Sequence, residues 1–240
     1  MMIMKTRQMK RMGLLALVVL VTTLDSCGKD RVPPDDPPSA EEPAQQPGVP
    51  KGFGDSSDAP EGTVFTWPQG VSVEGDIRGF DGYYEPELCG GRTRADQLDE
   101  GAYVLVCLSL RNDNETPVTV ALPAGLIFVS NDLAYQNGIL LQPGTIVIEP
   151  KSVTYQPIGL YCLNENRDPA TTESAYMVGP VTTYQPMLDF AGQVARKKVR
   201  PGQLPDFDIS TTLQSCVYDI CRNGRVSETY RHAFDAIPNR

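Results

Sequence analysis

The middle of the chain alternates between short apolar runs and clusters of turn-forming residues. The runs are rich in β-branched side chains, and Asn, Asp, Gly and Pro fill the intervals between them. The pattern predicts strands over residues 63–67, 102–110, 118–122, 126–130, 145–149 and 153–163. Both faces of the 102–110 segment are apolar, which indicates a central strand covered on two sides. Regularly spaced short strands favour a β-sandwich.

The last third of the chain changes to helical periodicity. Apolar residues recur at helical spacing over 186–199 and 211–222, and a shorter helix is expected over 227–236. Ser210 is a candidate N-cap for the second helix. The expected fold is therefore α+β: an antiparallel β-sandwich-like domain over residues 63–240, with two or three C-terminal helices.

The first 27 residues have the pattern of a bacterial secretion signal. Four cationic residues precede an apolar run over 13–21 that is too short to span a membrane. The run is followed by Leu-Asp-Ser-Cys, ending at Cys27, which resembles the lipobox of bacterial lipoproteins, although Asp25 stands where most lipoboxes carry a small residue. The resemblance implies that Cys27 is acylated and that its acyl chains anchor the protein to a membrane.

Residues 28–62 are rich in Pro and acidic residues and almost devoid of large apolar side chains. Such a segment buries too little surface to offset its ordering entropy, so we expect an extended tether. Its first acidic residues are similar to the surface-export signals of Bacteroidetes lipoproteins. That similarity implies an outer-membrane location, facing the extracellular side.

The overall charge narrows the class of partner. The 240 residues carry 21 basic and 30 acidic side chains, a net charge of -9, which argues against nucleic acid because phosphate binding needs a basic surface. The lone histidine, His232, has no nucleophile or metal motif around it, and no cofactor motif is present. The expected function is non-enzymatic binding of a surface protein or glycan. A cell-envelope hydrolase using a carboxylate pair and a fimbrial subunit remain alternatives.

The cysteines other than Cys27 are odd in number: Cys89, Cys107, Cys162, Cys216 and Cys221. If disulfides form, at least one thiol stays unpaired. Cys216 and Cys221 lie five residues apart on one predicted helix and point about 140° away from each other, so they cannot bridge. The remaining pairing is open, and several of the five are equally well explained as small buried apolar residues.

Two short motifs point to a more specific chemistry. Gly-Leu-Tyr-Cys-Leu-Asn places Cys162 after an aromatic residue at a strand end, and Thr-Thr-Leu-Gln-Ser-Cys-Val-Tyr places Gln214 in an early helical turn. Together they resemble the signature of bacterial thioester adhesin domains over residues 155–225. Leu213 stands where that family carries Thr, Cys216 replaces a small residue, and the interval between Cys and Gln is short for the family.

The resemblance implies an internal thioester between Cys162 and Gln214. A thiolate attacks the amide of Gln, ammonia leaves, and the thioester then transfers its acyl group to an amine on another molecule. Such a bond survives only in a water-poor pocket. The side chains expected to wall that pocket are Tyr161, Leu163, Val217 and Tyr218. In the alternative interpretation, Cys162 is a core residue and Gln214 a helix-flanking amide.

A second resemblance covers the segment from 122 to 144. Its Pro-Ala-Gly turn at 123–125, the Ile127-Phe128 strand and the Gln136-Asn137 pair are similar to uncharacterised secreted bacterial domains. That similarity implies a surface domain and no particular activity.

Overall fold

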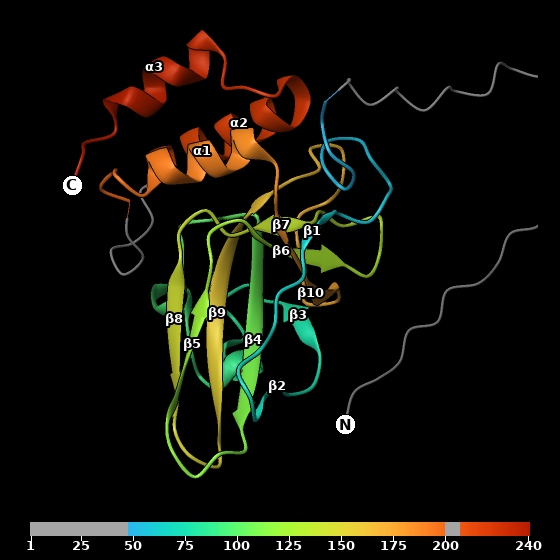
Figure 1. Cartoon of the computed structure of the whole chain (residues 1–240), viewed down its shortest axis with the longest axis vertical. Coiled ribbons are helices and arrows are strands. Elements are labelled where there is room, and N and C mark those ends of the chain that lie inside the picture. The colour runs from blue at the N-terminus through green and yellow to red at the C-terminus, as the bar shows by residue number, and fades with distance from the viewer. Residues whose placement is uncertain (1–47, 200–206) are drawn as a thin grey trace, which may run out of the picture. The chain divides into compact units, whose positions relative to one another are not determined.

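The computed structural model describes residues 48–199 and 207–240 (Figure 1). The secretion signal, Cys27 and the first part of the expected tether lie outside the described residues. Within the described ranges, no helix has the length and apolarity that crossing a bilayer requires.

Antiparallel strands build most of the domain. In chain order they are β1 (Gly62–Thr63), β2 (Val71–Val73), β3 (Ile77–Gly79), β4 (Val104–Asn112), β5 (Val118–Leu122), β6 (Leu126–Ser130), β7 (Gly138–Ile139), β8 (Gly144–Ile148), β9 (Ser152–Cys162) and β10 (Ala175–Thr182). Six of them pair in the order β10-β3-β4-β9-β7-β6, and β6 pairs again with β10, which closes the sheet into a barrel. Strands β1 and β2 attach to β10 and β4.

The expected β-sandwich is therefore wrong, although the fold is α+β overall. Closure depends on β10, which pairs with β3 at Ala175 and Tyr176 and with β6 from Tyr176 onward. No strand was predicted there, because Gly179 and Pro180 interrupt its apolar pattern. The register with β6 shifts between Val178 and Val181, at this Gly-Pro pair. The strands predicted from the sequence lack β10 and therefore do not indicate a closed sheet.

Strand β4 has the two covered faces that its sequence predicts. Residues of one parity, including Val104 and Leu108, are buried in the barrel core. Leu105 and Cys107 point to the other side, where they form a small separate cluster with Phe80 and Cys89. A two-stranded sheet of β5 and β8 adds further side chains to the barrel core.

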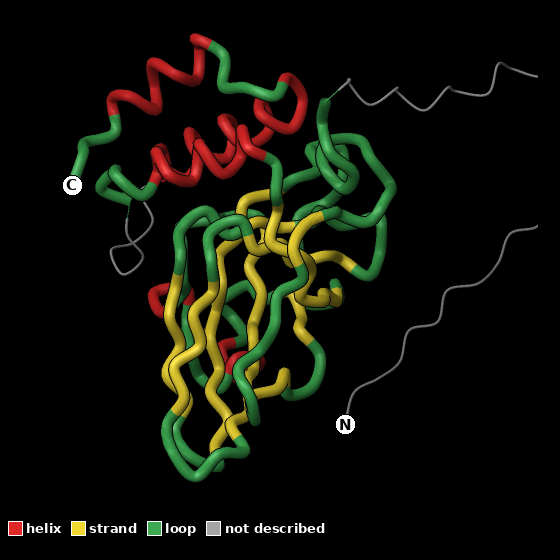
Figure 2. Tube along the Cα trace, in the orientation of Figure 1, coloured by secondary structure: helices red, strands yellow, loops and turns green. Residues whose placement is uncertain are grey.

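Three helices lie at one end of the barrel (Figures 1 and 2). They are α1 (Gln185–Val194), α2 (Phe207–Asn223) and α3 (Glu228–Ala236). A second apolar core fills the space between them and the barrel end. Tyr161 from β9 and Leu163, which follows the strand, contribute to it, as do Leu213 and Val217 from α2. Helix α2 begins before Ser210, so this residue does not cap it, and the Ser210 hydroxyl donates to the carbonyl of Glu100 at 2.9 Å.

Packing of the domain begins before residue 63, which is where the sequence predicts the start of the domain. Phe53 is fully buried in the core beneath the helices. The Asn164 amide donates to the carbonyls of Gly52 and Gly54 at 3.1 and 2.9 Å. Burial of the Phe53 ring contributes about 2 kcal/mol and, with these hydrogen bonds, attaches this part of the expected tether to the domain.

Candidate functional site

The end of strand β9 meets helix α2 at Cys162 and Gln214. Strand β4 starts its pairing with β9 at Val104 opposite Leu160, so it does not extend to Cys162. The Gln214 side chain takes the missing place: its oxygen accepts from the Cys162 N–H at 2.9 Å, and its nitrogen donates to the Cys162 carbonyl at 3.0 Å. Gln214 is 3% exposed, so this pair of hydrogen bonds is shielded from water.

The thiol of Cys162 points into the barrel core, where Tyr176 is also buried. Burial raises the pKa of this thiol to about 12, and hydrogen bonding to Tyr218 opposes the rise. The Tyr218 hydroxyl donates to the Gln136 side-chain oxygen at 3.0 Å. Gln214 and Tyr218 are one turn apart on α2, so the same helix face supplies both groups near Cys162.

The other side chains expected around the thioester lie on the opposite side of β9. Tyr161 and Leu163 alternate with Cys162 along the strand and point into the core beneath the helices, together with Val217. The structure thus brings together Cys162, Gln214 and Tyr218, and it separates them from the remaining three expected wall residues.

Gln136 and Asn137 are part of the same polar network. The Gln136 amide donates to the carbonyl of Arg167 at 3.0 Å, and the Asn137 side-chain oxygen accepts from the Ser130 N–H at 3.0 Å. The sequence marked this pair only through its similarity to secreted domains, and nothing in the pattern connected it with Cys162.

One disulfide forms among the described cysteines, between Cys89 and Cys107. Cys162, Cys216 and Cys221 are free and buried. The prediction that Cys216 and Cys221 do not bridge each other is therefore confirmed. Burial raises the pKa of each of these two thiols to about 12.

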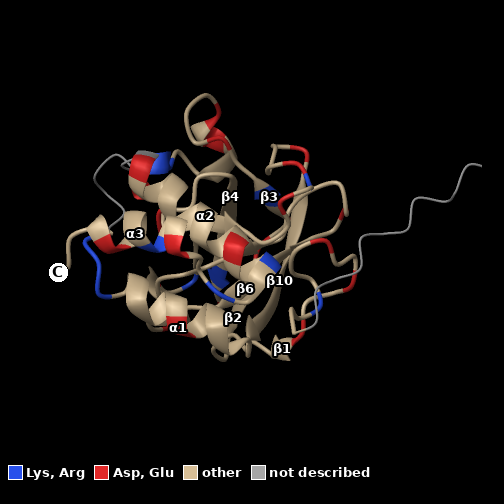
Figure 3. Ribbon diagram, turned by 90° about the horizontal axis from the view of Figure 1, so that it is seen from above, with Lys and Arg blue, Asp and Glu red and all other residues tan. Residues whose placement is uncertain are grey.

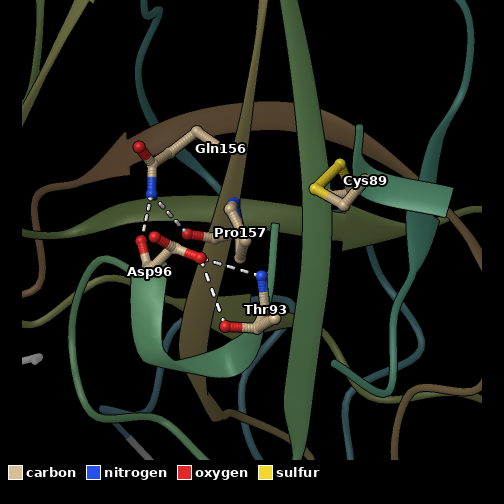
Figure 4. The surroundings of a disulfide bond; sticks show 6 residues. Cys89, Thr93, Asp96, Gln156 and Pro157 are labelled. Carbon is tan, nitrogen blue, oxygen red and sulfur yellow. Dashed lines mark hydrogen bonds between the residues drawn. A yellow bond between two sulfur atoms is a disulfide. The ribbon is translucent and has the colours of Figure 1, made fainter. Parts of the chain in front are cut away.

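The disulfide fastens an external loop, residues 80–92, to the outer face of β4; we call it the aromatic loop. Phe80 and Cys89 from the loop pack on Leu105 and Cys107 from the strand. The segment that follows is also fixed, because Asp96 accepts from the N–H and the hydroxyl of Thr93 at 2.9 and 3.2 Å (Figure 4).

The aromatic loop and the segment that follows it both rest on strand β9. The Gln156 amide donates to the carbonyl of Asp96 at 2.7 Å (Figure 4). The backbone of Gly90, with a φ of 58°, lies so close to the Tyr155 ring that a Cβ would come within 2.5 Å of it. Only glycine fits this position without displacing the ring.

Large apolar side chains on the aromatic loop face solvent. Tyr83, Tyr84 and Leu88 are 63%, 87% and 51% exposed. Their backbone is held by Asp81, whose carboxylate accepts from the N–H groups of Tyr83 and Tyr84 at 2.8 and 2.9 Å, and these bonds lower its pKa. The Arg94 guanidinium lies 5.9 Å from the centre of the Tyr83 ring. The sequence-based predictions missed this site. The signal that marks it is a pair of tyrosines among acidic residues, shortly before Cys89.

A buried carboxyl lies at the barrel end under α2. Asp99 accepts from the N–H groups of Leu141 and Gln142 at 2.7 and 2.9 Å and from that of Glu100 at 2.9 Å. Burial raises the pKa of Asp99 to about 6, against the lowering effect of these bonds. Within the described ranges, no group of three His, Cys, Asp or Glu side chains could hold a metal ion, and His232 is exposed.

Comparisons with known proteins give no match to a family model, to a curated protein or to a solved structure.

Proposed function

We propose that this chain is a lipid-anchored binding module of a bacterial outer membrane, facing outward, that contacts a surface protein or glycan through its aromatic loop. The observation that carries the proposal is the exposure of Tyr83, Tyr84 and Leu88 on a loop whose backbone is fixed. Tyr is enriched where binding energy concentrates, because a rigid amphipathic ring buries a large area at a small entropic cost.

The fixed backbone of the loop supports binding rather than a packing role. A disulfide, the Asp81 turn and the Gly90 contact with Tyr155 together leave few alternative loop conformations. Preorganisation of this kind lowers the entropy lost on association. The barrel interior, by contrast, is filled with buried apolar side chains, so the outer surface is the part that remains for a partner.

The test is retention on immobilised glycans and extracellular proteins. We expect Tyr83→Ser with Tyr84→Ser to reduce retention at least tenfold with no change in unfolding midpoint. The matched control is Val147→Ser with Met177→Ser, since both side chains are 55% exposed elsewhere on the surface. Equal retention by the two double variants would contradict the proposal.

The anchor has an independent test in the living bacterium. Metabolic labelling with a palmitate analogue should label the chain. Cys27→Ala should abolish both the label and the recovery of the protein in the membrane fraction. An unlabelled chain recovered free in the culture medium would contradict the anchored form.

A second candidate is covalent capture through a thioester, favoured by the contact of the Gln214 amide with the backbone of Cys162. In this reaction Cys162 Sγ forms a bond to the Gln214 amide carbon, the C–N bond breaks, and the thiol proton leaves with the nitrogen as ammonia. The Cys162 N–H already donates to the amide oxygen, which is the atom that gains negative charge during the attack. Burial of both groups supports survival of the bond against hydrolysis.

Intact mass distinguishes this candidate from simple binding. A thioester predicts a mass lower by one ammonia, and this deficit is absent in both Cys162→Ala and Gln214→Ala. Methylamine should open the thioester, free the thiol and leave an N-methyl amide, so the mass should then exceed the unmodified value by one CH2 group. Gln185→Ala, a change at an exposed amide on α1, is the control and should keep the deficit. An unmodified mass in freshly purified protein would remove the thioester.

A further inference from the structure

The charge around the aromatic loop limits what its rings can bind. Between Asp81 and Leu88 the loop carries three carboxylates and no cation. The Asp81 carboxylate is engaged by backbone N–H groups. Glu85 and Glu87 are exposed, and neither forms an ion pair with any residue of the described ranges. Two unneutralised carboxylates thus flank the exposed rings.

A hollow lies beside one of these carboxylates. It has a volume of about 310 Å³, and its walls include Glu85, Leu88, Asp76 and Arg78. The Arg78 guanidinium pairs with Asp76 at 2.9 Å, so that pair is already neutral. What remains is an apolar wall from Leu88 next to an unpaired carboxylate from Glu85. This combination suits a Lys or Arg side chain, which has an apolar stem and a cationic head.

The exposed tyrosine rings of the loop also favour a cationic partner. Arg94 lies over Tyr83, so one tyrosine of the loop already has a cation over its face. Tyr84 is 87% exposed, and across the described part of the chain no cation lies over its ring. The face of the Tyr84 ring therefore remains open to a cation of a partner. Tyr84 directly precedes Glu85 in the sequence.

The chain as a whole adds long-range attraction. Its net charge is -9, and acidic residues occur in many of the loops (Figure 3). An acidic surface speeds the encounter with a cationic partner and repels anionic ones.

We infer that the partner of the aromatic loop is a Lys- or Arg-rich protein segment, with one cationic side chain in the hollow beside Glu85 and Leu88 and a second over the face of Tyr84. The inference rests on the proposed binding function and names its partner class. A neutral glycan would use the rings alone and would not need the carboxylates.

The experiment measures binding of a fluorescent peptide of alternating Arg and Gly, and of the matching peptide with Glu in place of Arg, by anisotropy. We expect the Arg peptide to bind and the Glu peptide not to bind. Glu85→Gln with Glu87→Gln should weaken the Arg peptide about tenfold at low salt, and the affinity should fall as salt is added. Glu149→Gln with Glu228→Gln, a pair of exposed residues elsewhere, removes the same charge and should change affinity less than twofold.

The other outcomes separate this inference from the function on which it rests. Equal weakening by the two charge pairs would overturn the inference, because net charge alone would then explain binding. Retention of a neutral oligosaccharide that is lost in Tyr84→Ser, without binding of the Arg peptide, would overturn the basic partner and keep the binding function. If neither the tyrosine nor the glutamate variants alter any retention, both proposals fail.

Discussion

Gln214 completes the edge of strand β9 at Cys162. Its amide accepts from the Cys162 N–H at 2.9 Å and donates to the Cys162 carbonyl at 3.0 Å, so a helix side chain forms the two bonds that a neighbouring strand would otherwise form. Helix α2 and the end of the barrel are thereby joined by polar groups as well as by the apolar core between them.

Replacing Gln214 by Leu should destabilise the domain. The change leaves the N–H and carbonyl of Cys162 buried without partners, at about 1–3 kcal/mol each. We expect the free energy of unfolding in urea to fall by about 2–4 kcal/mol. Gln185→Leu removes an exposed amide from α1 and should change it by less than about 0.5 kcal/mol. Similar values for the two variants would show that the Cys162 groups find other partners.

The free thiols should be unreactive in the folded protein. Burial raises the pKa values of Cys162, Cys216 and Cys221 to about 12, so almost no thiolate exists at pH 8. In a Cys27→Ser background without reductant, iodoacetamide should add nothing to the native chain and three groups to the chain in guanidinium. Two groups instead of three, together with the ammonia deficit, would indicate the thioester; rapid native labelling would contradict the burial.

The disulfide should stabilise the domain by restricting the unfolded chain. Cys89 and Cys107 are 18 residues apart, and closing a loop of that length contributes about 3 kcal/mol. We expect Cys89→Ala with Cys107→Ala to lower the free energy of unfolding by about that amount and to expose the aromatic loop to proteolysis. An intact loop after limited trypsin treatment would show that Asp81 and Gly90 hold it without the disulfide.

Asp99 should make stability depend on pH in mildly acidic solution. Burial raises its pKa from 3.8 to about 6 in the folded state, whereas the unfolded side chain titrates near 3.8. Between these values the folded state binds more protons, so the free energy of unfolding falls as the pH rises from about 4 to about 6, by about 3 kcal/mol, and stays level above that. Burial raises the pKa of the neighbouring Tyr161 hydroxyl, so this group stays protonated over the same range.

The check is urea unfolding at pH 4.5, 5.5 and 6.5 for the wild type and Asp99→Asn. The amide does not titrate, so the difference between the two proteins should change across this interval, and the wild type should lose stability toward pH 6.5. A constant difference would place the folded pKa of Asp99 near its ordinary value.

The sequence by itself determined the elements whose signals are local. The strand over 118–122 was predicted with its observed bounds, and all three C-terminal helices were predicted. However, α1 ends at Val194, five residues before its predicted end, and α2 begins at Phe207, four residues before its predicted start. Such elements follow from side-chain periodicity and neighbouring turn residues, which act within a few positions of the chain. The resemblance around Cys162 and Gln214 implied a bond between their side chains, which stays a prediction; the observed contact joins the Gln214 amide to the Cys162 backbone.

Only the tertiary structure decided how the sheet closes and which residues meet. Closure depends on β10, whose Gly179 and Pro180 weaken its local signal, and whose partners β3 and β6 lie far away in the chain. The burial of Asp99, the attachment of Phe53 and the bonds from Gln214 to the Cys162 backbone also arise from segments distant in sequence. Periodicity shows which face of an element is buried, but it does not specify the partner that buries it, because many pairings bury similar apolar areas.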